Sequence, residues 1–271
     1  MKLAYVVATS DVPWHENMNS CQGNLEEIFL LLSEMEYAGI ELMVRDPDLL
    51  NRRQIERLAR AYHIEIPLIN TVALPDNDGI SLMDIKEEKR QEAVRRTKLI
   101  IDLAEIFGAQ VSIGKLRGQL DQRIPEEVSV AYMLDAFKSL TEYASKKKVI
   151  LVLEPIARIL CNNINTIQEG IAYIELINSE YFLLLADIFH MNLEEKSLAS
   201  GFYQAKPFLS HVHISDSNRL APGRGNLDFK KILDLLKSIA YEGYLSAEIR
   251  QFPSQDIAIC ETSRVMKELI K

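Results

Sequence analysis

Two of the five histidines in this 271-residue chain stand one residue apart, in the segment HVHISDSNRLAPGRG at residues 211–225. Histidine is a common metal ligand, and alternate residues of a β-strand point to the same side. Alternation therefore does not choose between His211 and His213. Because His213 lies nearer the carboxyl end of its apolar run, we expect His213 to be the ligand and His211 a buried, hydrogen-bonded support.

Acidic side chains close three other apolar runs of strand length. Glu154 ends VILVLE, and Glu248 ends YLSAE. Asp187 ends FLLLAD, with His190 just beyond it. A carboxylate buried alone at the end of such a strand would be costly in free energy. Three acids and one histidine, on four consecutive strands, therefore suggest a shared cation.

The donor types indicate which cation would bind. Three carboxylates and one imidazole, without a thiolate, suit a hard divalent ion. We expect one Mn²⁺, with Mg²⁺, Co²⁺ or Zn²⁺ as alternatives. The competing interpretation is that each acid pairs with a nearby base such as Arg158, Arg219 or Arg250. That explanation is as good as a metal for any single acid, but it explains all four positions together less well.

Strand-length apolar runs alternate with amphipathic helical patterns along the whole chain. The expected strands are residues 3–9, 39–45, 64–73, 109–115, 149–156, 182–189, 209–215 and 244–249. Near-continuous apolar strands separated by helices predict a parallel sheet covered on both faces. Eight such units predict a single α/β domain over residues 1–271, a closed (β/α)₈ TIM barrel, with an open doubly wound sheet as the alternative.

A barrel of this kind places its active site at the carboxyl ends of its strands. The acids and His213 described above all stand at such ends. Two irregular stretches, residues 10–23 and 74–87, also follow expected strands and are long for barrel loops. We expect them to lie over the mouth of the barrel and to act as lids.

Composition narrows the classes of function. The chain has 48% hydrophobic residues, 26% charged residues and a net charge of −8, which disfavours a nucleic-acid partner. Its three cysteines (Cys21, Cys161 and Cys260) form no paired framework, so we expect a cytoplasmic protein. No apolar stretch is long enough to cross a membrane, so we expect no membrane partner.

Four motifs in the carboxyl-terminal half resemble one known family. They are LEP at 153–155, ADIFHMNLEE at 186–195, HVHISDSNRLAPGRGNLDF at 211–229 and SAEI at 246–249. They are similar to the xylose isomerase-like TIM barrel superfamily, and within it to ketose 3-epimerases of the D-tagatose 3-epimerase type. The amino-terminal half agrees with this family only in its alternation of strands and helices.

The resemblance implies a metal-dependent sugar isomerase or epimerase. It implies these metal ligands: Glu154, Asp187, His213 and Glu248. It also implies that Glu154 and Glu248 are the acid/base groups, while His190 and Arg219 hold substrate oxygens. Placed on the first and last ligand strands, the two glutamates would approach a ketose from different sides. One removes the proton beside the carbonyl and the other returns it to the opposite face, which epimerises C3 through a metal-stabilised enediolate.

Other reactions on the same site are alternatives. A single base would favour an aldose–ketose or hydroxypyruvate-type isomerase. Expulsion of a β-hydroxyl would instead give an inosose or dehydroshikimate-type dehydratase. An apurinic-site endonuclease of the same superfamily is disfavoured, because the second and third expected strands end without the histidines that its zinc cluster needs. By analogy with the family, we expect a homodimer or a homotetramer.

The substrate is expected to be a small sugar or sugar phosphate. Where such epimerases tend to read ExxNRxE, this chain reads EPIARIL, so Ala157 and Leu160 replace an asparagine and an acid. Basic residues follow several expected strands and make a further set of substrate-binding candidates: Lys115, Arg117, Arg158, Arg219 and Arg250. They would suit an anionic sugar, or they balance the site's own carboxylates together with Asp76 and Asp78 of the second loop.

Overall fold

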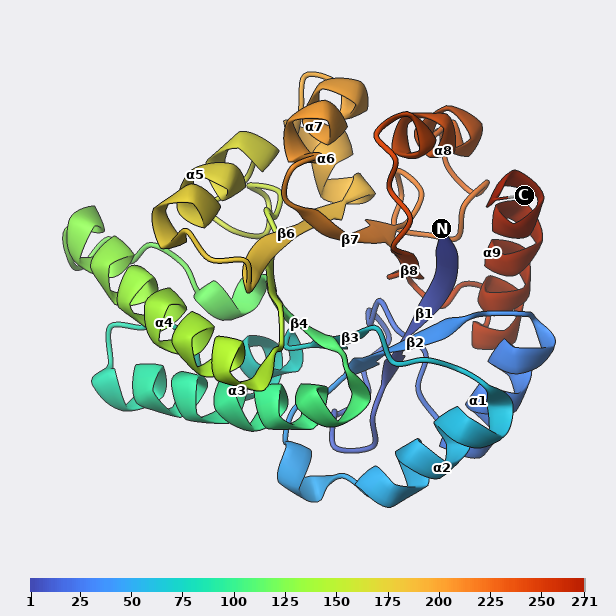
Figure 1. Cartoon of the computed structure of the whole chain (residues 1–271), viewed down its shortest axis with the longest axis horizontal. Helices are drawn as coiled ribbons and strands as arrows, with labels where there is room; N and C mark the ends of the chain where they lie inside the picture. Colours follow the sequence, from blue (N-terminus) through green and yellow to red (C-terminus); the bar gives the residue numbers. More distant parts are fainter. Residues whose placement is uncertain (271) are drawn as a thin grey trace.

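Eight parallel strands form a closed barrel, as predicted. The computed structural model describes residues 1–270. Its strands are β1 (Lys2–Ala8), β2 (Gly39–Met43), β3 (Leu68–Asn70), β4 (Gln110–Ile113), β5 (Leu151–Leu153), β6 (Phe182–Asp187), β7 (Leu209–Ile214) and β8 (Tyr244–Ala247). Each strand pairs in parallel with the next along the chain, and β1 pairs with β8 to close the barrel (Figure 1).

Helices form an outer ring around the strands (Figure 1). They are α1 (Leu25–Glu34), α2 (Arg52–Tyr62), α3 (Glu87–Phe107), α4 (Glu126–Lys147), α5 (Ile167–Ile177), α6 (Ile188–Glu194), α7 (Leu198–Ala205), α8 (Phe229–Ser238) and α9 (Gln255–Ile270). Within residues 1–270, no helix combines the length and the apolar character needed to cross a membrane.

Alternation along each strand separates an outer shell from the barrel interior. Ile40 and Leu42 of β2 pack with the helices in one large apolar core. The residue between them, Glu41, points inward, because its carboxylate reaches His213 of β7 and those two strands are not neighbours in the sheet. The barrel interior therefore contains charged side chains, whereas the shell between strands and helices is apolar.

Every strand except β1 is shorter than its expected range, and the third differs most. The expected strand covers residues 64–73, whereas β3 spans only Leu68–Asn70. Pro67, immediately before β3, has no N–H to donate to a sheet ladder. On its amino-terminal side only an isolated bridge joins Glu65 to Gly39. The run is thus buried at most of its positions but paired over only a part of it.

Candidate active site

Four side chains meet at the carboxyl ends of β5 to β8. Glu154 follows β5, Asp187 ends β6, and Glu248 follows β8. His213 of β7 lies between them, its Nδ1 being 3.4 Å from Glu154 Oε1, 3.7 Å from Asp187 Oδ2 and 3.6 Å from Glu248 Oε2. One donor atom from each residue lies within 4.8 Å of the other three, and all four residues are buried. The structure thus brings the expected ligand set together.

The donor atoms of this cluster fit a shared cation. Within residues 1–270, the buried atoms His213 Nδ1 and Glu154 Oε1 have no hydrogen-bond partner. Buried polar atoms without a partner are costly, so such atoms point to a ligand that satisfies them. Three carboxylates and one imidazole offer the oxygen and nitrogen donors that suit divalent ions such as Mn²⁺ and Mg²⁺. The residues present therefore fit a divalent metal.

Local structure holds two of these carboxylates in place. Asp187 is the N-cap of α6, and its Oδ1 accepts two backbone N–H groups of the first helical turn, at 2.7 and 3.3 Å. The other oxygen, Oδ2, then faces the cluster. Glu154 Oε2 occupies the space beside Gly114, where a Cβ would collide with it. A helix cap and a glycine thus determine where the two carboxylates lie.

Arg219 balances part of the negative charge. Its Nη1 donates to Asp187 Oδ2 at 2.6 Å, and its Nη2 donates to Glu248 Oε2. Burial acts to raise the pKa of Asp187, but the positive charge of Arg219 and the two nearby histidines holds that pKa well below its ordinary value. For Glu248 burial dominates, and its pKa rises to about 7 despite the opposing effect of Arg219.

The cluster borders a cavity of about 370 Å³, a volume suited to a small molecule. Glu154, Glu248, His190 and Arg219 all line this cavity. His190 Nδ1 is buried and has no hydrogen-bond partner within the described chain. Burial lowers the pKa of His190, which leaves a neutral imidazole at the cavity wall.

Both stretches expected to act as lids border the cavity. The first contributes Val12, His15, Asn17, Met18 and Asn19, and the second contributes Asp76 and Asn77. In the first loop, Val12 and Met18 pack with Met43 of β2 in a small apolar cluster. The two loops therefore form one wall of the cavity, on the side of β1 to β3.

Lys115 and Arg250 are the expected basic residues, besides Arg219, that line the cavity. Lys115 Nζ pairs with Asp76 Oδ2 of the second loop at 3.2 Å. The positive charge of Lys115 is thus balanced by the protein itself.

The structure does not bring Arg117 and Arg158 to the cavity. Arg117 is fully buried, and its Nη1 donates to the backbone carbonyls of Gly114 at 2.8 Å and Glu154 at 2.9 Å. A buried guanidinium must satisfy its donors, and here backbone carbonyls do so. The Arg158 side chain is 65% exposed, and its Nε pairs with Glu194 at 2.9 Å. Arg117 supports the loops, and Arg158 lies at the surface.

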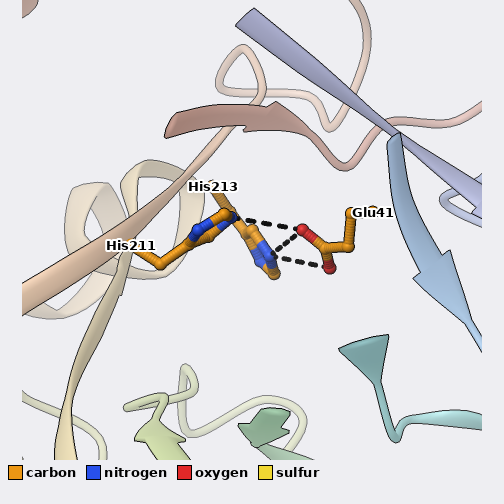
Figure 2. Close-up of side chains that lie close together, drawn as sticks. All are labelled: Glu41, His211 and His213. Carbon is orange, nitrogen blue, oxygen red and sulfur yellow. Dashed lines mark hydrogen bonds and ion pairs between the residues drawn. The ribbon is translucent and has the colours of Figure 1, made fainter. Parts of the chain in front are cut away.

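Two inward residues of the amino-terminal half also contact the cluster, and no motif in the sequence predicts them. Glu41 receives His213 Nε2 at 3.1 Å from each carboxylate oxygen and lies 3.3 Å from His211 Nε2 (Figure 2). Asn70, which ends β3, donates from Nδ2 to Glu41 at 2.9 Å and to Glu248 at 3.3 Å. The available signal for Glu41 is a charged residue in the middle of the apolar run GIELMVR.

The two histidines of the HVH segment differ in their surroundings. Burial acts to lower the pKa of His213, but Glu41 and Glu248 outweigh it and raise that pKa well above its ordinary value. His211 Nε2 lies 2.8 Å from Ser246 Oγ, deeper along the strand, and burial lowers its pKa. His213 therefore lies among four carboxylates, whereas His211 contacts Ser246 and Glu41.

Comparisons with known proteins agree with the barrel fold. The sequence matches the xylose isomerase-like TIM barrel family over residues 29–269. It is 29% identical over 235 residues to 3-dehydro-D-guloside 4-epimerase of Escherichia coli (strain K12), with 84% of this chain and 87% of that protein covered. It is 28% identical over 235 residues to L-ribulose 3-epimerase of Mesorhizobium japonicum, with 85% and 77% covered.

A solved structure shows the same fold. The crystal structure of Escherichia coli 3-keto-D-glucoside 4-epimerase, in its apo form, superposes with a TM-score of 0.82 at 22% sequence identity. The superposition covers 99% of each chain. The likeness thus includes the amino-terminal half, where the sequence motifs are weak.

Proposed function

The chain belongs to the xylose isomerase-like TIM barrel family, and from this premise we propose that it epimerises a ketose at C3 with a divalent metal and two glutamates. Its relatives are named as epimerases, and the chain is an enzyme of this isomerase class. Both relatives' names place the inverted carbon beside a ketone. An endonuclease is not favoured, because β2 and β3 present Glu41 and Asn70 to the interior rather than histidines.

One observation carries the proposal: Glu154 and Glu248 line the same cavity from the ends of two different strands. Their strands, β5 and β8, lie on opposite sides of β6 and β7. A ketose held between the two carboxylates meets one of them on each face. One glutamate removes the proton from the carbon beside the ketone, and the other delivers a proton to the opposite face.

The cluster would hold the metal through Glu154, Asp187, His213 and Glu248. When bound, a divalent cation polarises the substrate carbonyl and stabilises the negative charge that develops on its oxygen. We propose Mn²⁺ because hard oxygen donors outnumber nitrogen in this set. His190 offers a neutral imidazole to a substrate oxygen, and Arg219 holds two of the ligand carboxylates while it faces the cavity.

The charges around the cavity favour a neutral sugar over a sugar phosphate. Lys115 pairs with Asp76, and Arg219 pairs with two carboxylates of the site. Among the lysines and arginines of residues 1–270 that line the cavity, Arg250 is the one without an ion pair. Phosphate recognition usually combines several charged donors, so a ketose phosphate is the second candidate substrate class.

The test is incubation of the Mn²⁺ form with neutral ketoses, ketose phosphates and inososes in D₂O. We expect a neutral ketose to be inverted at C3 with deuterium incorporated at that carbon. Deuterium at C1 or C2 would indicate an aldose–ketose isomerase, and loss of water would indicate a dehydratase. Either of these two results would overturn C3 epimerisation. Turnover of phosphates alone would overturn the choice of a neutral ketose as substrate. A complete lack of exchange would overturn proton transfer itself.

We also propose a cytoplasmic location and assembly as a homodimer or homotetramer. Cys21 and Cys161 are buried free thiols, which suits a reducing compartment. Light scattering coupled to size-exclusion chromatography measures the assembly state. A monomer at micromolar concentration would contradict this part of the proposal.

A further inference from the structure

We propose that Glu41 is a positioning residue, which orients His213 so that its Nδ1 faces the other three metal ligands. The inference rests on the proposed metal site and adds a residue from the opposite side of the barrel. Glu41 is fully buried on β2, and it contacts His213 through the barrel interior rather than along the sheet.

The hydrogen-bond geometry determines which ring nitrogen carries the proton. His213 Nε2 lies 3.1 Å from both oxygens of Glu41, and a carboxylate only accepts hydrogen bonds. The Nε2 atom must therefore carry the hydrogen. When the cluster holds a metal, Nδ1 is the nitrogen that can offer its lone pair, because it faces Glu154, Asp187 and Glu248 and has no hydrogen-bond partner within residues 1–270. A carboxylate behind a ligating imidazole sets both ring orientation and ligand strength.

Glu41 is itself held firmly. Asn70 Nδ2 donates to Glu41 Oε1 at 2.9 Å, and His211 Nε2 lies 3.3 Å from Oε2. Figure 2 shows the two imidazoles directed at this one carboxylate. Asn70 also contacts Glu248 at 3.3 Å, so the same support extends to the second catalytic glutamate. A carboxylate with donors on each side does not rotate freely, which is what a positioning role requires.

A different role for these residues is a second metal site. Glu41, His211 and His213 also present one donor atom each within 4.8 Å of one another. His213 Nε2 cannot both donate a hydrogen to Glu41 and coordinate a metal. The 3.1 Å distances to both carboxylate oxygens fit a shared hydrogen, so we favour a single metal on the Nδ1 side.

The test compares Mn²⁺ binding by metal-free wild type and Glu41→Gln, measured by isothermal titration calorimetry. Gln keeps the size of the side chain but removes the charge that fixes the Nε2 proton. We expect one Mn²⁺ per chain in both proteins and a dissociation constant about 10–100-fold higher in the variant. Leu58→Ala is the matched control for general loss of stability, because Leu58 is buried on α2 in the outer shell. Its dissociation constant should stay within about twofold of wild type, as expected for a residue outside the metal's surroundings.

Two results would overturn the proposal. One is an unchanged dissociation constant in Glu41→Gln, and the other is binding of two metal ions by wild type with one lost in the variant. If the variant does not fold, ¹⁵N-histidine NMR of the wild-type Mg²⁺ form decides. The expected signature is a proton on Nε2 of His213, and a proton on Nδ1 would refute the positioning role. Neither measurement needs turnover, so failure here is distinct from failure of the proposed reaction.

Discussion

The two halves of the barrel contribute differently to the candidate site. Strands β5 to β8 each supply one of the expected metal ligands at the carboxyl end. Strands β1 to β4 supply none of these four, but they provide the loops that wall the cavity and the inward residues Glu41 and Asn70. One half thus presents the proposed reacting groups, and the other half contributes residues that contact those groups from across the barrel.

The comparison shows why the motifs are uneven along the chain. A ligand must stand at a particular height on its strand, which leaves a recognisable acid or histidine after an apolar run. A supporting residue acts through contacts across the interior, and many side chains could make such contacts. The supporting half therefore leaves a fainter pattern in the sequence than the ligand-bearing half.

The largest expected effect comes from the ligand-bearing half. Glu154→Gln and Glu248→Gln should each lower kcat by about 10³-fold or more, because each removes a proton-transfer group and a metal donor. Steady-state epimerisation and D₂O exchange at saturating Mn²⁺ measure the loss. Glu127→Gln, on the exposed face of α4, is the control and should keep wild-type activity. Near-normal turnover in either active-site variant would refute the two-base scheme.

A smaller but still large effect is expected from the supporting half. In Gly114→Ala the new Cβ would collide with Glu154 Oε2, so that the carboxylate must move. We expect kcat/KM to fall by about 10²-fold, since a misplacement of a reacting group by about 1 Å can cost that much. Gly23→Ala is the matched control, because its Cβ would meet only Ile28, at 3.8 Å. Equal activity in the two variants would mean that β4 does not shape the site.

The smallest effect is expected from Arg158→Gln. Arg158 follows a ligand strand, but its side chain is 65% exposed and pairs with Glu194 away from the cavity. Exposed ion pairs of this kind contribute little, so kcat and KM should change by less than about twofold. Kinetics on the best ketose of the panel provide the measurement. A tenfold rise in KM would instead show that Arg158 contacts the substrate.

Much of the fold was predictable because burial patterns are local. Amphipathic helices separate the strands, and the eight apolar runs all become strands. The strand ends were less predictable, since apolar character continues beyond the paired residues. Around β3, Pro67 and the departure of the chain after Asn70 limit the ladder to three residues.

The basic residues show where prediction from strand position fails. Arg117 and Arg158 both stand just after strands, as the expected substrate contacts would. Nothing in the local sequence tells that Arg117 turns toward the carbonyls of Gly114 and Glu154, or that Glu194 draws Arg158 to the surface. A long flexible side chain takes whichever partners the surrounding loops offer, and those loops are placed by tertiary structure.

The sequence by itself determined eight strand–helix units, through its alternating apolar runs, and the position of Glu154, Asp187, His213 and Glu248 toward the carboxyl ends of consecutive strands. Only the tertiary structure decided the orientation of His213. Its partner Glu41 lies 172 residues away in the chain and on a strand that it does not pair with. Closure of the barrel brings β2 and β7 to face each other across the interior. A hydrogen bond made through that interior depends on this closure, so no local pattern encodes it.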